Sequence, residues 1–70
     1  MKKMRDMRLE EGFSQAELAR KTRMNQTHIS EIERNVRQPW PKARRSIARV
    51  LGVHPHELWP DLEKGGSGKK

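Results

Sequence analysis

Signals that begin and end helices divide this chain into short segments, and this punctuation constrains the fold more than any other feature. Gly12 and Gly52 are typical of positions just past the end of a helix. Ser14 with Glu17 three residues later forms a capping box, and Pro41 suits the first position of a helix. Between these signals apolar residues recur at helical spacing, so we expect helices at about 2–11, 15–22, 26–34, 41–51 and 55–59. No segment alternates apolar and polar residues, so the sequence predicts an all-α fold.

The chain offers little apolar material for a core. It has 70 residues, of which 31% are hydrophobic, and it contains no cysteine. A domain of this size therefore has one thin core, with no disulfide or thiolate–metal site to brace it. We expect one domain over residues 1–61, followed over residues 62–70 by a flexible Gly/Ser/Lys tail whose composition resembles an artificial addition.

The net charge of +7 is confined to the middle of the chain. Residues 1–19 and 50–70 are each electrically balanced, whereas residues 20–49 hold nine Lys and Arg against Glu31 and Glu33. Such a concentration is typical of a face that docks on a polyanion. A solvated basic face without a partner is the alternative that charge alone leaves open.

The two segments at 15–22 and 26–34 form a pair. A turn of three or four residues joins them, with Asn25 as the natural N-cap of the second. In that second segment Ile29 and Ile32 make one narrow apolar stripe, which leaves an unusually polar face for a helix in so small a core. Two short helices in this arrangement are the pattern of a helix-turn-helix.

Several short motifs together point to a known family. They lie at residues 7–8, 12–15, 18–19, 24–34, 47–48, 51–53 and 58. With this spacing, residues 4–58 resemble the XRE family of DNA-binding regulators, the class that includes the Cro and lambda-type repressors. The resemblance implies a compact five-helix, lambda-repressor-like domain with a central helix-turn-helix. A shorter likeness, over residues 38–43 and 55–60, is to the Ner-like regulators of transposable phages, which carry Trp-Pro-Lys before the fourth helix and Trp-Pro after the fifth.

The resemblance implies that the helix over 26–34 reads bases in the major groove of DNA. With its apolar stripe turned inward, the base-reading candidates on its outer face are Gln26, Thr27, Ser30 and Glu31. Gln26 and Thr27 lie at the amino end, where a Gln suits adenine and a Thr methyl suits thymine. Glu31 would accept from cytosine N4 or repel phosphate. An ordinary solvated helix face is the alternative.

Other positions are expected to contact the DNA backbone. Helix amino ends attract phosphate through their free N–H groups and their dipole, and the family's loop after the second motif helix follows the DNA strand. The backbone candidates are Gln15, Asn25, His28, Arg34, Asn35, Arg37 and Lys42. Capping alone is an equal alternative for Asn25. Arg44 and Arg45 are either further phosphate contacts or part of a solvated helix face.

The resemblance also implies a structural ion pair between Arg8 and Glu33, which would tie the first helix to the end of the third. The chain departs from the family where Arg23 and Asn35 replace usual glycines. Asn tolerates positive φ, whereas an arginine held there would be strained by roughly 1–2 kcal/mol.

A third departure concerns helix four. Arg44 and Arg45 stand where the family commonly has leucines, so the register of this helix is left open. If the helix is shifted or rotated, Trp40 and Trp59 would supply the missing core volume.

These features predict a transcription regulator that binds double-stranded DNA sequence-specifically, and a repressor that acts by occupying an operator. We expect no enzyme activity, metal, cofactor or small-molecule ligand, because no catalytic constellation is visible and His54 and His56 lack a third ligand. No apolar run reaches the roughly 18 residues of a membrane span, so a cytoplasmic, nucleoid-associated protein is expected. The DNA partner would be bound by a monomer or by a homodimer.

Two other functions would share the fold. An antitoxin-type module would bind a protein partner and regulate its own gene, although little chain is left for a toxin-neutralising surface. A basic RNA-binding domain is the second alternative. It lacks the aromatic platform on which single-stranded bases stack, since the chain has no Tyr and one Phe.

Overall fold

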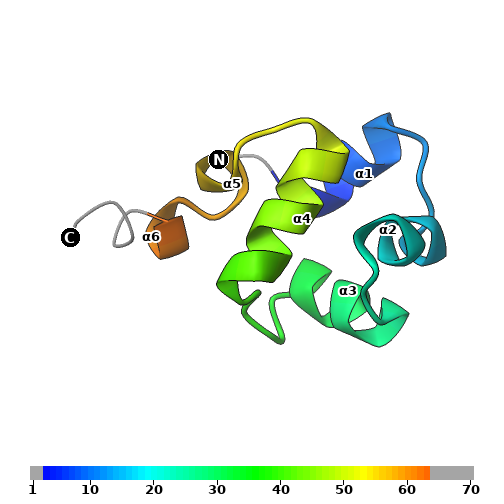
Figure 1. Ribbon diagram of the computed structural model, residues 1–70, viewed down its shortest axis with the longest axis horizontal. Helices are drawn as coiled ribbons and strands as arrows, with labels where there is room; N and C mark the ends of the chain where they lie inside the picture. The colour runs from blue at the N-terminus through cyan, green and yellow to red at the C-terminus, as the bar shows by residue number, and fades with distance from the viewer. Residues whose placement is uncertain (1–2, 64–70) are drawn as a thin grey trace.

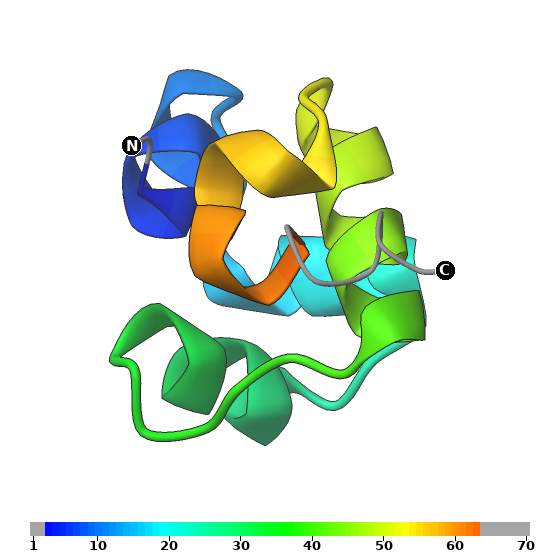
Figure 2. The ribbon, with the colours of Figure 1, turned by 90° about the vertical axis from the view of Figure 1, so that its left-hand side faces the viewer.

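The computed structural model describes residues 3–63, and within them the chain forms six helices (Figure 1). They are α1 (Met4–Glu10), α2 (Gln15–Thr22), α3 (Gln26–Glu33), α4 (Pro41–Leu51), α5 (Pro55–Leu58) and α6 (Pro60–Glu63). No strand occurs in this part of the chain, so the predicted all-α class is confirmed. Helix α3 and the loop over 34–40 lie along the lower edge of the molecule in two views a quarter-turn apart (Figure 1, Figure 2).

The prediction of five helices is wrong by one, because Pro60 separates two helical turns. Helix α5 ends before Pro60, as expected, but the proline then takes the first position of α6, where it has no N–H to lose. The N–H groups of Leu62 and Glu63 both donate to the Trp59 carbonyl at 3.1 Å. The first two residues of the predicted tail therefore lie in α6, and the rest of that tail, 64–70, lies outside the described residues.

Capping side chains begin the two central helices at the predicted positions. Ser14 Oγ accepts from the Glu17 N–H at 3.0 Å, and a Glu17 carboxylate oxygen accepts from the Ser14 N–H at 2.8 Å. The capping box is thus confirmed, and the Ser14 backbone hydrogen bond lowers the pKa of the Glu17 carboxyl. Asn25 Oδ1 caps α3 by accepting from the Thr27 N–H at 2.7 Å. Both helix starts are therefore determined by neighbouring side chains.

Two residues in place of glycine adopt the left-handed conformation. Arg23 ends α2 with φ 59°, and Asn35 follows α3 with φ 61°. The Met24 N–H donates back to the Ala19 carbonyl at 2.8 Å, a pattern typical of left-handed helix ends. The expected strain at Arg23, roughly 1–2 kcal/mol, therefore applies to the turn of the motif.

The core lies where α2, α3 and α4 meet. Leu18, Ile29 and Ile47, one from each helix, are fully buried. The other buried apolar residues of the core cluster are Met4, Ala19, Ile32, Ala48, Leu51 and Leu58. Several half-buried side chains, among them Met24, Val50 and Trp59, pack against this cluster. The described residues include no helix that is both long and apolar enough to cross a membrane.

Helix α4 has the expected bounds, Pro41–Leu51. Arg44, which stands where the family commonly has a leucine, makes polar contacts on this helix. Its Nη1 donates to the Pro39 carbonyl at 2.8 Å, and its Nε forms an ion pair with Glu63 of α6. The Arg44 side chain is only 14% exposed. The alternative of a solvated helix face is therefore wrong for this residue.

The two tryptophans have different environments. Trp59 packs against the core, as expected. Trp40 is 40% exposed, so its expected role in filling the core is wrong. It precedes α4 between Pro39, which is buried, and Pro41, and its ring packs edge-on against His28 and not against the core cluster.

Candidate nucleic-acid interface

Helix α3 presents a polar surface because its two isoleucines point into the core. Gln26 and Thr27 are exposed in its first turn, and Ser30 and Glu31 are half-buried further along. The four predicted base-reading residues thus lie on one short helix at the edge of the molecule (Figure 2). Gln26 and Thr27 are therefore the two most accessible of these four residues.

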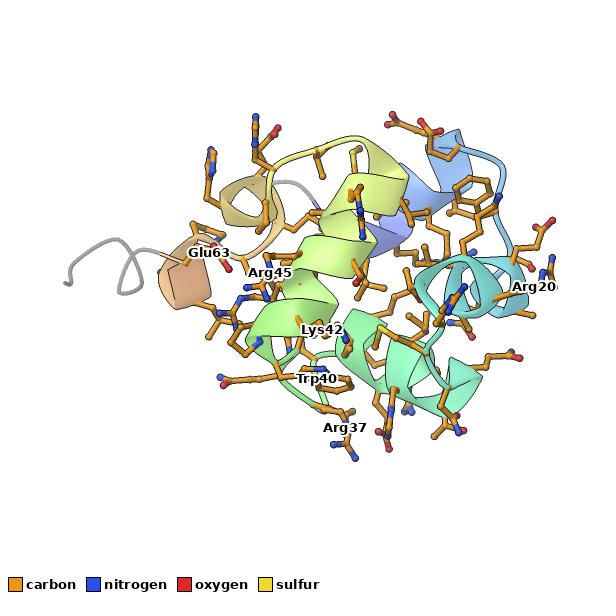
Figure 3. All side chains as sticks on the ribbon, in the orientation of Figure 1. Arg20, Arg37, Trp40, Lys42, Arg45 and Glu63 are labelled. Carbon is orange, nitrogen blue, oxygen red and sulfur yellow. The ribbon has the colours of Figure 1, made fainter. Side chains whose placement is uncertain are left out.

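Most of the predicted backbone-binding residues adjoin this helix and are accessible. Those exposed to solvent are Asn25, Arg34, Asn35, Arg37 and Lys42. Figure 3 shows Lys42 at the lower end of α4 and Arg37 below it, on the same edge of the molecule as α3. Arg34 and Arg37 in the loop after α3, and Lys42 at the amino end of α4, therefore form a basic border beside α3.

Arg37, a backbone candidate, is hydrogen-bonded to Glu31, a base-reading candidate. Its Nε donates to a Glu31 carboxylate oxygen at 2.7 Å. The Glu31 main-chain carbonyl also accepts from the N–H groups of Val36 and Arg37, at 2.9 and 3.3 Å. Glu31 therefore folds the loop back onto α3, and its carboxylate is occupied in the free protein.

Gln15, at the first position of α2, turns toward the protein. Its Nε2 donates to a Glu33 carboxylate oxygen at 3.1 Å. Glu33 also receives two hydrogen bonds from Arg8, whose Nη1 donates to the Phe13 carbonyl at 2.7 Å. The Arg8 and Glu33 side chains are 9% and 4% exposed. This cluster joins α1, the following loop, α2 and the end of α3.

His28 is half-buried, and its ring meets Trp40 edge-on. The ring centroids are 5.6 Å apart at an interplanar angle of 87°. The contact joins the middle of α3 to the residue that precedes α4. The Trp40 side chain, which is 40% exposed, lies below Lys42 and above Arg37 in the view of Figure 3.

Comparison with known proteins shows which family carries this geometry. The helix-turn-helix family model HTH_3 matches residues 4–58. The chain belongs to the XRE-type helix-turn-helix family. The family match supports DNA binding and a role in transcription regulation. A chain of the solved SinR protein/SinI protein complex is similar in structure, with a TM-score of 0.77 and 31% sequence identity. The likeness covers 87% of this chain and 60% of that one. No curated protein shows a significant sequence match.

The XRE-type resemblance did not reveal three contacts of this surface: Gln15 with Glu33, Arg37 with Glu31, and His28 with Trp40. Each joins residues from different elements or across a turn, so helical spacing alone does not predict it. The one sequence signal near them is the Trp40 ring held between two prolines after a polar loop.

The Arg37 hydrogen bond has a measurable consequence in this XRE-type domain. It lowers the pKa of the Glu31 carboxyl, because the guanidinium stabilises the carboxylate. The pair is therefore complete above the ordinary Glu pKa and is lost as the pH falls through the depressed value. We expect the Glu31 carboxyl to titrate below an ordinary Glu in NMR, and Arg37→Ala to move the midpoint upward. An unchanged midpoint in this variant would show that the pair does not persist in solution.

Proposed function

We propose that this regulator is a repressor that binds a specific double-stranded DNA operator and acts by occupying it. The observation that carries the proposal is the polar face of α3. Its first turn exposes Gln26 and Thr27 to solvent, and Arg34, Arg37 and Lys42 border it. In this mode the helix face reads base edges, while the border holds phosphates and sets the register. A regulator bound to its operator would exclude other proteins from the same stretch of DNA.

A selection from random duplexes tests the sequence-specific part of the proposal. We expect a short enriched motif. Two half-sites spaced by about one helical turn would indicate a homodimer on DNA, and one half-site a monomer. A reporter gene with the selected motif inside its promoter then tests repression. Absence of any enriched motif would contradict sequence-specific binding, and an undiminished reporter signal would contradict repression.

Single substitutions separate base reading from backbone contact. Gln26→Ala should relax the preference at one base pair by about 1–3 kcal/mol, because a bidentate contact is lost there. Arg37→Ala should weaken binding to all sequences by a similar factor. The measurement is a competition titration against every single-base variant of the selected site. If Gln26→Ala left the whole preference profile unaltered, Gln26 would not read a base.

A further inference from the structure

A second basic surface lies between α4 and the turn that joins α2 to α3. It is a groove of about 460 Å³, within the range of about 300–1,000 Å³ that is typical of ligand-binding clefts. Its cationic lining residues are Lys21, Arg23, Lys42 and Arg49, and no acidic side chain of the described residues lines it. Lys42, which lines the groove, lies at the lower end of α4 in the view of Figure 3.

The groove is distinct from the surface proposed to read DNA. Of the residues assigned to bases or to the DNA backbone, Lys42 alone lines it. Arg49 lies further along α4, roughly 10 Å from Lys42 along the helix axis. Because α4 runs upward from the edge that carries α3, the groove leads away from that edge (Figure 1). A duplex seated on α3 would therefore leave most of the groove open.

The four cations that line the groove form no ion pair with any of the described residues. Lys21 lies over the Phe13 ring with its ammonium 5.0 Å from the ring centroid. Arg23, one of these cations, is exposed and has a left-handed backbone conformation. A second copy of this chain is a poor occupant, because two chains of net charge +7 repel each other.

The groove also contains apolar groups that phosphate would not use. Half-buried Met24 and Val50 lie in it, and Trp40, 40% exposed, stands at its lower end. A DNA backbone offers charge to such a surface but few apolar contacts. A protein segment with apolar side chains on one face and carboxylates beside them matches both parts of the lining.

We propose that this groove binds an acidic amphipathic helix of a partner protein. Its apolar face would lie against Met24, Trp40 and Val50, and its carboxylates would meet Arg23 and Arg49. The distance from Lys42 to Arg49 fits about two turns of such a helix. The site would let a protein partner bind while α3 remains on DNA.

The test uses a fluorescein-labelled helical peptide with leucines on one face and glutamates on both flanks. Titration of the full chain is followed by anisotropy, and a peptide of identical composition with the leucines scattered is the reference. We expect the amphipathic peptide to bind at least about tenfold more tightly than the scattered one. Ser46→Glu and Arg49→Glu, which place carboxylates on the α4 side of the groove, should each weaken binding by about tenfold.

Arg20→Glu is the matched control, since Arg20 is exposed on α2, outside the groove, and undergoes the same charge reversal. It should change peptide affinity by less than about twofold. Equal binding of the two peptides, no binding, or an equal loss in Arg20→Glu would overturn the proposal. So would a tenfold loss of DNA affinity in Ser46→Glu, because the groove would then belong to the DNA interface. The peptide titration contains no DNA, so it is decided independently of the repressor proposal.

Discussion

Arg8→Ala should lower the melting temperature of this domain by more than about 12 °C, because breaking a buried pair costs on the order of 3–5 kcal/mol and each kcal/mol shifts a small domain by about 4–8 °C. The change leaves the Glu33 carboxylate, 4% exposed, without its cation. It also removes the donor to the Phe13 carbonyl. The measurement is thermal unfolding followed by far-ultraviolet circular dichroism.

Arg37→Ala is the matched comparison, because it also deletes an arginine from an ion pair. The Arg37 side chain is 46% exposed, so solvent screens its pair with Glu31 and the loss should be within about 1 kcal/mol. Arg8→Lys should fall between the wild type and Arg8→Ala, since an ammonium keeps the charge but does not reproduce both contacts of the planar guanidinium. Equal melting temperatures for Arg8→Ala and Arg37→Ala would show that the Arg8 cluster does not hold the fold together.

Raising the salt concentration fourfold should weaken operator binding by a few hundred to a few thousand fold. The reason is counterion release: with about five to seven phosphate contacts, the slope of log affinity against log salt is about −4 to −6. Fluorescence anisotropy on the selected duplex, repeated over a series of salt concentrations, measures this slope. An affinity that does not depend on salt would contradict docking on phosphates.

Two lysine and arginine variants refine this measurement. Lys42→Ala should reduce the magnitude of the slope by about one, because one phosphate contact is lost. Arg49→Ala should leave the slope nearly unchanged, because Arg49 lies in the groove that leads away from the reading helix. If the two variants changed the slope equally, the DNA interface would extend over the length of α4.

Capping residues and helical spacing predict most of the helices, but they do not predict α6 or the contacts between residues distant in sequence. Ser14 and Asn25 cap the predicted helices because a side chain and the backbone two or three residues later suffice to form the contact. The single turn of α6 is too short to show an apolar period, and Pro60 has the same appearance whether it ends or begins a helix. The environment of Arg44 was equally hidden, because its ion-pair partner, Glu63, is distant in sequence.

The candidate site depends more on resemblance than on periodicity. The inward stripe of α3 predicts which face is polar, and the structure shows Gln26 and Thr27 exposed on that face. Periodicity does not assign a role to Gln15 or Glu31, because the sequence does not show whether their polar side-chain groups bond to DNA or to another residue of the chain. In the folded chain Glu33 and Arg37 engage those groups. For side chains with several donors or acceptors, only the tertiary structure shows which partner they bond to.

The loop over 34–40 has no regular secondary structure, yet hydrogen bonds hold it in its middle and near its carboxyl end. Glu31 holds the backbone at Val36 and Arg37, and Arg44 holds the carbonyl of Pro39. Freezing a free loop upon binding would cost conformational entropy, of the order of 1–2 kcal/mol for each residue ordered. Here the intramolecular hydrogen bonds have already restricted the chain before any ligand arrives. The loop is therefore preorganised, and a larger share of its contact energy with a polyanion is left to appear as affinity.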